Sequence, residues 1–428
     1  MGTGPLAGIR VLEFSQLVAA PFCGNILSDA GADVVKVEPL GGDPHRAAGA
    51  VVPGMGKRFQ SLNRGKRSLA VDLHTPEGRA LIHRLVPDFD VAIINYRGGA
   101  SERLGVDYET LRRLNPRLIY CEITGFGSAG PLKDRGGTDL VGVAYSGLMV
   151  GEGKVDKDGS PLGVTSSSIA DYSAGFSAAT AIGFALFHRE RSGMGQKVET
   201  SLLQASLAIQ DTAVMRDPVH DTVIRDRVVE EVRAVRARRG TYVEMLEART
   251  RGRGVGLAFR GYYGGYQTQD GAFLILGALT PGTRKAARTV LGVTGDPSEA
   301  PDFDASDPAS IAAGERVREQ IEATMRSRPI AEWVDAFERA GVPCAPVNVP
   351  EEMSEDPQVV ALGLMRHIDH PVLGPQEVVG PIASMSETPL DVRGPAPILG
   401  AHSVEVLTEH GLQRAEIDAL LARGVIGN

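Results

Sequence analysis

A strand–helix–strand pattern near the N-terminus constrains the fold of this chain more than any other feature of its sequence. Two short apolar runs, Ile9–Phe14 and Asp33–Glu38, are separated by a helical stretch, Ala20–Ala30, and by Gly31. This spacing is typical of a β-α-β unit, in which the helical crossover makes the two strands parallel. We therefore expect the N-terminal region to begin a parallel sheet.

Later parts of the chain continue the alternation of strands and helices. Further strands are predicted at Ser68–Leu73, Asp90–Asn95 and Leu118–Ile123, with short helices between them. One of these helices begins at Thr75, a capping residue that is followed by proline at the first helical position. The pattern predicts a large domain of the doubly wound parallel α/β class.

In such a domain the ligand usually binds beyond the carboxyl ends of the strands. The segments that follow the predicted strands are Ser15–Ala19, Pro39–Asp43, Asn95–Ala100 and Thr124–Gly130. No G-x-G-x-x-G fingerprint follows the first strand, and the sequence contains no Walker A loop, which disfavours a nicotinamide or ATP enzyme of the usual kind. The stretch Asn95–Arg103 is either a cradle for phosphate and adenine or an ordinary loop with solvated arginines.

The second half of the chain predicts a smaller α+β domain between two connectors. Its clearest elements are a hairpin about Asp270-Gly271, helices at Ile311–Met325 and Ile330–Ala340, and a proline-containing edge strand at Gly341–Val347. Two helices, His402–His410 and Arg414–Leu421, end the chain. The expected boundaries are a large domain at 1–210, a linker at 211–240, the small domain at 241–346, a second linker at 347–380, and a C-terminal segment at 381–428 that returns to the large domain.

Composition narrows the class of protein. The 428 residues are 43% hydrophobic, which suits a globular chain with more than one domain, and the net charge of −8 argues against general nucleic-acid binding. The three cysteines are far apart, so they predict neither a disulfide framework nor a zinc site and favour a reducing compartment, the cytoplasm. Neither a signal peptide nor a membrane-spanning run is expected.

The stretch Val164–Gln204 contains the most informative acidic residue. An apolar helix is predicted from about Ser173 to Arg189, and its lack of charge indicates burial on most sides. Asp171 lies where this helix begins. It is either an N-cap, which accepts hydrogen bonds from the first helical turn, or a carboxylate nucleophile held at the positive end of the helix.

Several motifs, in this order and spacing, resemble the class III coenzyme A transferase family over nearly the whole chain. That family includes formyl-CoA transferase, carnitine CoA-transferase and α-methylacyl-CoA racemase. The matching segments are Pro5–Phe14, Gly31–Glu38, Asn63–Ser68, Asp72–Gly78, Asn95–Gly105, Gly193–Val198, Trp333–Pro346 and Leu399–His402.

The resemblance implies that Asp171 is the nucleophile of a CoA-transferase. Its carboxylate would attack an acyl-CoA thioester, and the reaction would pass through a mixed anhydride and an aspartyl-CoA thioester. A small carboxylic acid would be the second substrate, with no metal and no redox cofactor. The positions implied for coenzyme A are Gln16, Leu17, Val18, Ala19, Leu73, Asn95, Tyr96, Arg97 and Arg103.

The resemblance also implies an intertwined homodimer, with Met215–Arg239 and Val347–Leu364 as the arms of each ring, and with neither nucleic acid nor membrane as a partner. Two departures from the family bear on specificity. Thr138 stands where the racemase has a basic histidine, which disfavours racemisation, and Gly261–Gly265 contains tyrosines where formyl-CoA transferase has consecutive glycines. An acyl-CoA racemase or epimerase and an inactive acyl-CoA-binding relative remain the alternatives.

The tyrosines near Gly261 have two interpretations of their own. Tyr262, Tyr263 and Tyr266 either line a pocket for an acid larger than formate or are half-buried aromatics of a strand.

Overall fold

The computed structural model describes residues 4–163, 167–253, 261–294, 296 and 308–428. The chain divides into two compact units, Met1–Met215 with Pro357–Asn428, and Arg216–Asp356. The C-terminal segment thus belongs to the same unit as the N-terminal half of the chain.

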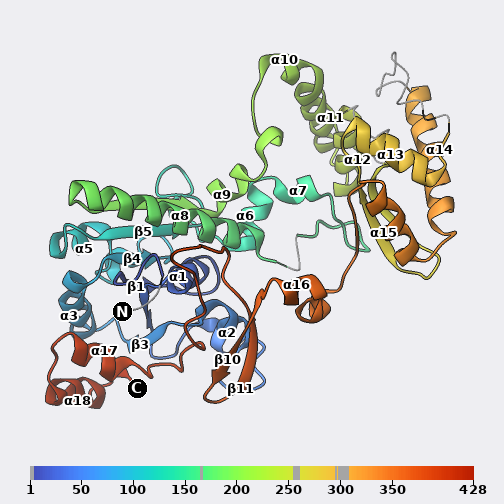
Figure 1. Cartoon of the computed structure of the whole chain (residues 1–428). Coiled ribbons are helices and arrows are strands. Elements are labelled where there is room, and N and C mark those ends of the chain that lie inside the picture. The colour runs from blue at the N-terminus through green and yellow to red at the C-terminus, as the bar shows by residue number, and fades with distance from the viewer. Residues whose placement is uncertain (1–3, 164–166, 254–260, 295, 297–307) are drawn as a thin grey trace. The chain divides into compact units, whose positions relative to one another are not determined.

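The first unit is built on a seven-stranded sheet with the order β12-β3-β2-β1-β4-β5-β6 (Figure 1). Every pairing from β3 to β6 is parallel, and only β12 runs antiparallel, against β3. The strands are β1 (Arg10–Phe14), β2 (Asp33–Glu38), β3 (Arg67–Val71), β4 (Val91–Ile94), β5 (Ile119–Thr124), β6 (Gln196–Ser201) and β12 (Ile426–Gly427). The predicted parallel α/β class is confirmed, whereas β6 and β12 were not predicted.

Helices cover both faces of this sheet because successive strand residues point to opposite sides. Leu12 packs into a core cluster with α3, α5, α17 and α18, while its neighbour Val11 packs into another with α1, α6, α8 and α9. The first group is α3 (Pro76–Leu85), α5 (Tyr108–Leu114), α17 (Ser403–Glu409) and α18 (Arg414–Ala422). The second group is α1 (Ala19–Asp29), α6 (Asp139–Tyr145), α8 (Ile169–Ser192) and α9 (Leu202–Ala208).

Shorter elements complete the first unit. They are α2 (Lys57–Asn63), α4 (Ala100–Arg103), α7 (Leu148–Glu152), α16 (Pro357–Ala361) and an antiparallel hairpin of β10 (Met365–His370) and β11 (Gly374–Val379). The predicted cap of α3 is present, since the Thr75 side chain accepts a hydrogen bond from the backbone N–H of Gly78 at 3.0 Å.

Helix α8 differs from the sequence-based expectation. It was expected to be buried on most sides, but within this chain it buries one face only, which includes Ala174, Ala178 and Ile182. On the other face Phe184 and Phe187 are 71% and 66% exposed. The apolar composition that suggested burial therefore describes two faces, of which the sheet covers one.

The second unit contains a three-stranded antiparallel sheet with the order β7-β8-β9. The predicted hairpin and the edge strand are confirmed as β7 (Tyr263–Gln267), β8 (Phe273–Gly277) and β9 (Cys344–Pro346). Its helices are α10 (Pro218–His220), α11 (Asp226–Ala237), α12 (Tyr242–Arg253), α13 (Pro281–Leu291), α14 (Pro308–Met325) and α15 (Ile330–Arg339). Trp333, Tyr262 and Tyr266 are the largest buried side chains of a core formed between this sheet and the helices.

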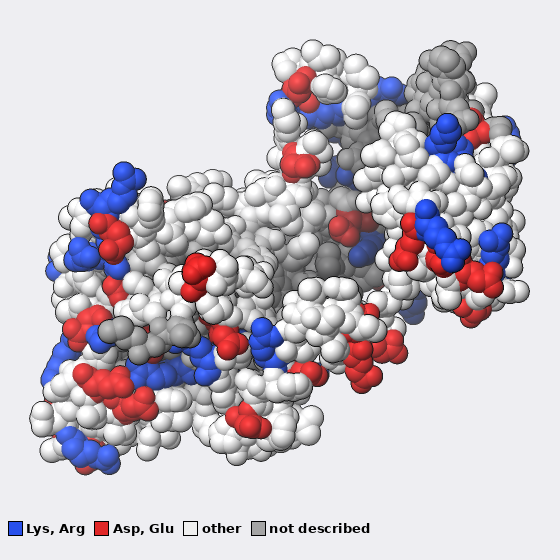
Figure 2. Space-filling model, in the orientation of Figure 1, with Lys and Arg blue, Asp and Glu red and all other residues white. Residues whose placement is uncertain are grey.

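Acidic and basic side chains lie side by side on the face of the molecule that Figure 2 shows. Among the described helices, none is both long and apolar enough to cross a membrane.

Candidate functional site

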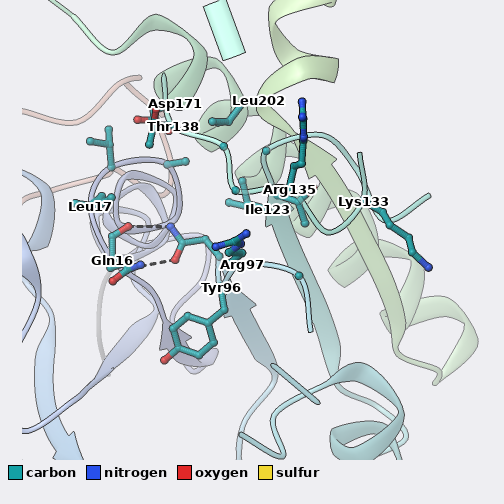
Figure 3. A pocket seen from close by; sticks show the side chains of 18 residues that line it. Gln16, Leu17, Tyr96, Arg97, Ile123, Lys133, Arg135, Thr138, Asp171 and Leu202 are labelled. Atoms are coloured by element: carbon teal, nitrogen blue, oxygen red, sulfur yellow. Dashed lines mark hydrogen bonds between the residues drawn. The ribbon is translucent and has the colours of Figure 1, made fainter. Parts of the chain in front are cut away.

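A pocket opens beyond the carboxyl ends of three neighbouring parallel strands, β1, β4 and β5. Each strand contributes the residues that follow it, and the loop before α6, the start of α8 and the start of α9 complete the wall (Figure 3). The lining residues are Gln16–Ala19, Asn95–Gly98, Ile123–Gly125, Lys133, Arg135–Thr138, Asp171 and Leu202. This is the edge of the sheet at which the sequence predicted a ligand.

The structure brings most of the predicted site residues together at this pocket. Those that line it are Gln16, Leu17, Val18, Ala19, Asn95, Tyr96, Arg97 and Asp171. Leu73 lines a second pocket, which shares Gln16 and Tyr96 with the first, so the two are adjacent. Arg103, the last residue of α4, lines neither.

A pair of hydrogen bonds joins the ends of β1 and β4. The Asn95 side chain accepts from the backbone N–H of Gln16 at 3.0 Å and donates to the Gln16 carbonyl at 2.8 Å. An amide side chain is suited to this double contact because it carries a donor and an acceptor together. The contact fixes the segment that begins the pocket wall (Figure 3).

Leu17 has a backbone conformation that side chains other than glycine rarely adopt, with φ at 67°. The Asp43 carboxylate holds it there by accepting from the Leu17 N–H at 3.3 Å. Asp43 in turn pairs with the fully buried Lys36 at 3.2 Å, and Lys36 also donates to the Ser15 carbonyl at 3.1 Å. A buried charge network therefore supports the strained turn that lines the pocket.

The structure contradicts the interpretation of Asp171 as an N-cap. Helix α8 begins at Ile169, so Asp171 lies inside the first turn, and Ser168 occupies the cap position without a capping side-chain bond. Asp139 performs the capping instead. One of its carboxylate oxygens accepts from the backbone N–H groups of Ala170 at 2.8 Å and Asp171 at 3.2 Å.

The Asp171 carboxylate is left for other chemistry. No described residue donates a hydrogen bond to it, although it lines the pocket. Burial and, next, the negative charge of Asp139 raise the pKa of Asp171 from 3.8 to about 7, while the positive charge of Arg58 opposes the shift. Burial also raises the pKa of Asp139, against the two backbone hydrogen bonds that it accepts.

Sequence reasoning missed several parts of this site. Lys133 and Arg135 line the pocket from the loop before α6, and Asp139, the first residue of α6, caps α8. Thr138, considered above only as a departure from the racemase, lines the pocket as well. Two glycines carried a usable signal. A Cβ on Gly125 would lie 2.6 Å from the Cα of Gly137, so only glycines allow the loop after β5 to approach the loop before α6 so closely.

The tyrosines of the second unit belong mainly to its core. Tyr262 and Tyr266 are 0% and 2% exposed, and the Tyr262 hydroxyl donates to Asp296 at 2.8 Å. Tyr263 is 55% exposed on the same strand region. Of the two interpretations, the structure favours strand aromatics for Tyr262 and Tyr266.

Comparison with known proteins gives a consistent result over the full length. The sequence matches the profile of CoA-transferase family III over residues 6–403. It is 36% identical over 416 residues to a succinate–glutarate CoA-transferase of Agrobacterium fabrum, covering 95% of each chain. It is 31% identical to a succinyl-CoA–D-citramalate CoA-transferase of Chloroflexus aurantiacus, covering 99% of this chain and 98% of the relative.

Solved structures show the same fold. A CAIB/BAIF family protein from Brucella suis superimposes with a TM-score of 0.71 at 28% identity, covering 95% of this chain and 100% of that chain. Rv3272 from Mycobacterium tuberculosis superimposes with a TM-score of 0.74 at 25% identity, covering 94% of this chain and 99% of that chain.

Proposed function

Because the chain belongs to CoA-transferase family III, we propose that it moves coenzyme A from an acyl-CoA donor to a free carboxylic acid with Asp171 as the nucleophile. The observation that carries this proposal is the state of the Asp171 carboxylate. It lies in the pocket at the strand ends, and Asp139 caps the helix in its place. A carboxylate with a raised pKa in a pocket is a candidate catalytic group.

The chemistry proceeds by acyl exchange alone. The Asp171 carboxylate attacks the thioester carbonyl, a C–O bond forms, the C–S bond breaks, and CoA leaves as a thiolate. The thiolate then attacks the Asp171 carbonyl of the mixed anhydride, which releases the donor acid and leaves an aspartyl-CoA thioester. The acceptor carboxylate attacks this thioester, and the returning thiolate takes the acceptor's acyl group and frees Asp171. No proton or electron is gained or lost over the cycle.

The two adjacent pockets supply a place for the CoA portion. Arg97 lies in the wall of the first pocket, where a guanidinium can bind phosphate oxygens through parallel hydrogen bonds. The second pocket is lined by Leu73 and shares Tyr96, which suits a flat ring system such as adenine. We assign the nucleotide to these pockets and the reacting thioester to the Asp171 end.

The exposed face of α8 supports a homodimer. Phe176, Phe184 and Phe187 are 44%, 71% and 66% exposed. Phe176 and Phe187 are eleven residues apart, which is about three helical turns, and Phe184 precedes Phe187 by three residues, so all three lie on one side of the helix. Single apolar side chains are common on surfaces, but three phenylalanines on one helix face are typical of an interface. We propose that a second copy of the chain covers this face.

Replacing Asp171 by asparagine tests the proposal. An amide is a very poor nucleophile, so Asp171→Asn should not transfer CoA between succinyl-CoA and glutarate, the acids in the name of the Agrobacterium relative. Stability should not fall, because Asp139 caps the helix and because the amide removes a buried charge. At pH 8 we expect a gain of about 1–3 kcal/mol in the free energy of unfolding. An active, folded Asp171→Asn variant would show that another group is the nucleophile.

A further inference from the structure

Arg58 places a second kind of recognition group beside the proposed nucleophile. It is an exposed residue near the start of α2, and its guanidinium donates a hydrogen bond to the Ser168 hydroxyl. Ser168 is the residue immediately before α8, and Asp171 lies in the first turn of that helix. Since an α-helix rises 1.5 Å per residue, Ser168 and Asp171 are roughly 4.5 Å apart along the helix axis.

No acidic side chain in the part of the chain that the structure describes neutralises the charge of Arg58. Of the residues that the structure describes, no carboxylate forms an ion pair with it, and its one side-chain hydrogen bond goes to a neutral hydroxyl. Its field nevertheless reaches both acids of the site, because it lowers the pKa values of Asp139 and Asp171 against the effect of burial. Arg58 thus presents an open guanidinium fork next to the reacting carboxylate.

Arg58 also stands apart from the other cations of the site. Arg97, Lys133 and Arg135 line the pocket from the loop after β4 and the loop before α6, the side assigned above to coenzyme A. Arg58 comes from α2 and contacts the residue that precedes the nucleophile's helix. A cation at that place is suited to the acid portion of the substrate rather than to the nucleotide.

We propose that Arg58 binds a second carboxylate on the acid whose first carboxylate reacts at Asp171, so that the preferred substrates are short dicarboxylic acids. This inference rests on the proposed function. A guanidinium pairs with a carboxylate through two parallel hydrogen bonds, which selects for position as well as for charge. The short separation between Ser168 and Asp171 limits the preference to acids with few carbons between their two carboxyl groups.

A comparison of two acids of equal length tests the inference. Glutarate and valerate are offered as acceptors with butyryl-CoA as donor, whose acyl group has no second carboxylate, and the ratio of their kcat/KM values is measured. The ratio cancels any general effect of Arg58 on the ionisation of Asp171. The wild-type enzyme should favour glutarate at least tenfold, and Arg58→Gln should lower the ratio roughly tenfold to a hundredfold. Arg58→Lys, which keeps the charge without the fork, should give an intermediate ratio.

Lys57 offers a matched control, since it is an exposed cation on the same helix and Lys57→Gln removes the same charge. That variant should keep the wild-type ratio. Equal losses with both acids in Arg58→Gln would place Arg58 at the reacting carboxylate and overturn the inference, as would a wild-type enzyme without preference for glutarate. Failure of the proposed function is distinct, because then the wild-type enzyme would form no new thioester with either acid, nor any glutaryl-CoA from succinyl-CoA and glutarate. Release of butyrate from butyryl-CoA alone checks that Arg58→Gln is folded and reactive.

Discussion

Replacing Asp139 by asparagine should move the pH dependence of catalysis while leaving the helix cap in place. The Asp139 oxygen accepts two backbone N–H bonds at the start of α8, and an asparagine oxygen can accept the same bonds. What the substitution removes is a negative charge that, after burial, raises the pKa of Asp171 to about 7. Without that charge the ionised form of Asp171 becomes more favourable, so its pKa must fall.

The size of the shift follows from Coulomb's law. The capping oxygen of Asp139 lies 3.2 Å from the backbone nitrogen of Asp171, which places the two carboxylate charges within roughly 7 Å of each other. At an effective dielectric constant of about 20, two unit charges at that separation interact by about 2.4 kcal/mol, equivalent to about 1.7 pKa units. The Asp171 carboxylate borders a pocket that admits water and Asp139 is only half-buried, so water screens the interaction further, and burial is the larger cause of the shift. We therefore expect the pKa of Asp171 to fall by about one unit, from about 7 to about 6.

The assay is the first half-reaction, followed as the single-turnover release of the donor acid from acyl-CoA without an acceptor. Because the attacking group is the carboxylate, the rate rises as the pH passes the pKa of Asp171. The midpoint should lie near pH 7 in the wild-type enzyme and about one unit lower in Asp139→Asn. Asp158→Asn, a change at an exposed loop residue, is the control and should keep the wild-type midpoint. A midpoint that stays in place or rises in Asp139→Asn would refute this account of the site.

Further predictions concern the pockets, the exposed helix face and the buried charges. Arg97→Ala should raise the KM for acyl-CoA about tenfold or more in steady-state assays, and Arg103→Ala should raise it less, because only Arg97 lines a described pocket. A larger KM increase in Arg103→Ala than in Arg97→Ala would indicate that the phosphates bind near α4 instead. Phe187→Glu should weaken the proposed dimer, so that sedimentation detects monomer of this variant. An unchanged dimer would show that the interface does not include this face of α8. Asp43→Ala should cost about 2–4 kcal/mol in urea unfolding because it leaves the buried Lys36 with fewer partners, and a loss below about 1 kcal/mol would contradict the role given to this network.

Much of the fold could be predicted because local patterns determine it. The β-α-β unit at Arg10–Glu38 and the hairpin at Tyr263–Gly277 follow from strand periodicity and turn residues. The strand β12 is only Ile426–Gly427, too short to show a pattern, and it exists because β3 offers it an edge. The burial of α8 was overestimated because the sequence does not say whether an apolar face packs on the same chain or on another.

The candidate site was predicted in outline, and its electrostatics were not. The parallel sheet explains why Gln16–Ala19 and Asn95–Arg97 meet, since the residues after neighbouring parallel strands gather at one edge. Asp139 caps α8 by binding Ala170 and Asp171, which follow it by 31 and 32 residues in the sequence, and no local pattern reveals such a contact. The same holds for Lys36, a charged residue on a strand predicted from its apolar character, whose acidic partners come from other segments.

The most direct test of the central claim is the identification of the residue that carries the acyl-enzyme intermediate. The enzyme is mixed with acyl-CoA, the aspartyl thioester or anhydride is trapped with hydroxylamine or borohydride, and the modified peptide is identified by mass spectrometry. The account predicts that the modification lies on Asp171 in the wild-type enzyme and is absent in Asp171→Asn. A modification on Asp139 or another acid would contradict it. So would trapping that adds the same mass to the peptide in Asp171→Asn as in the wild-type enzyme.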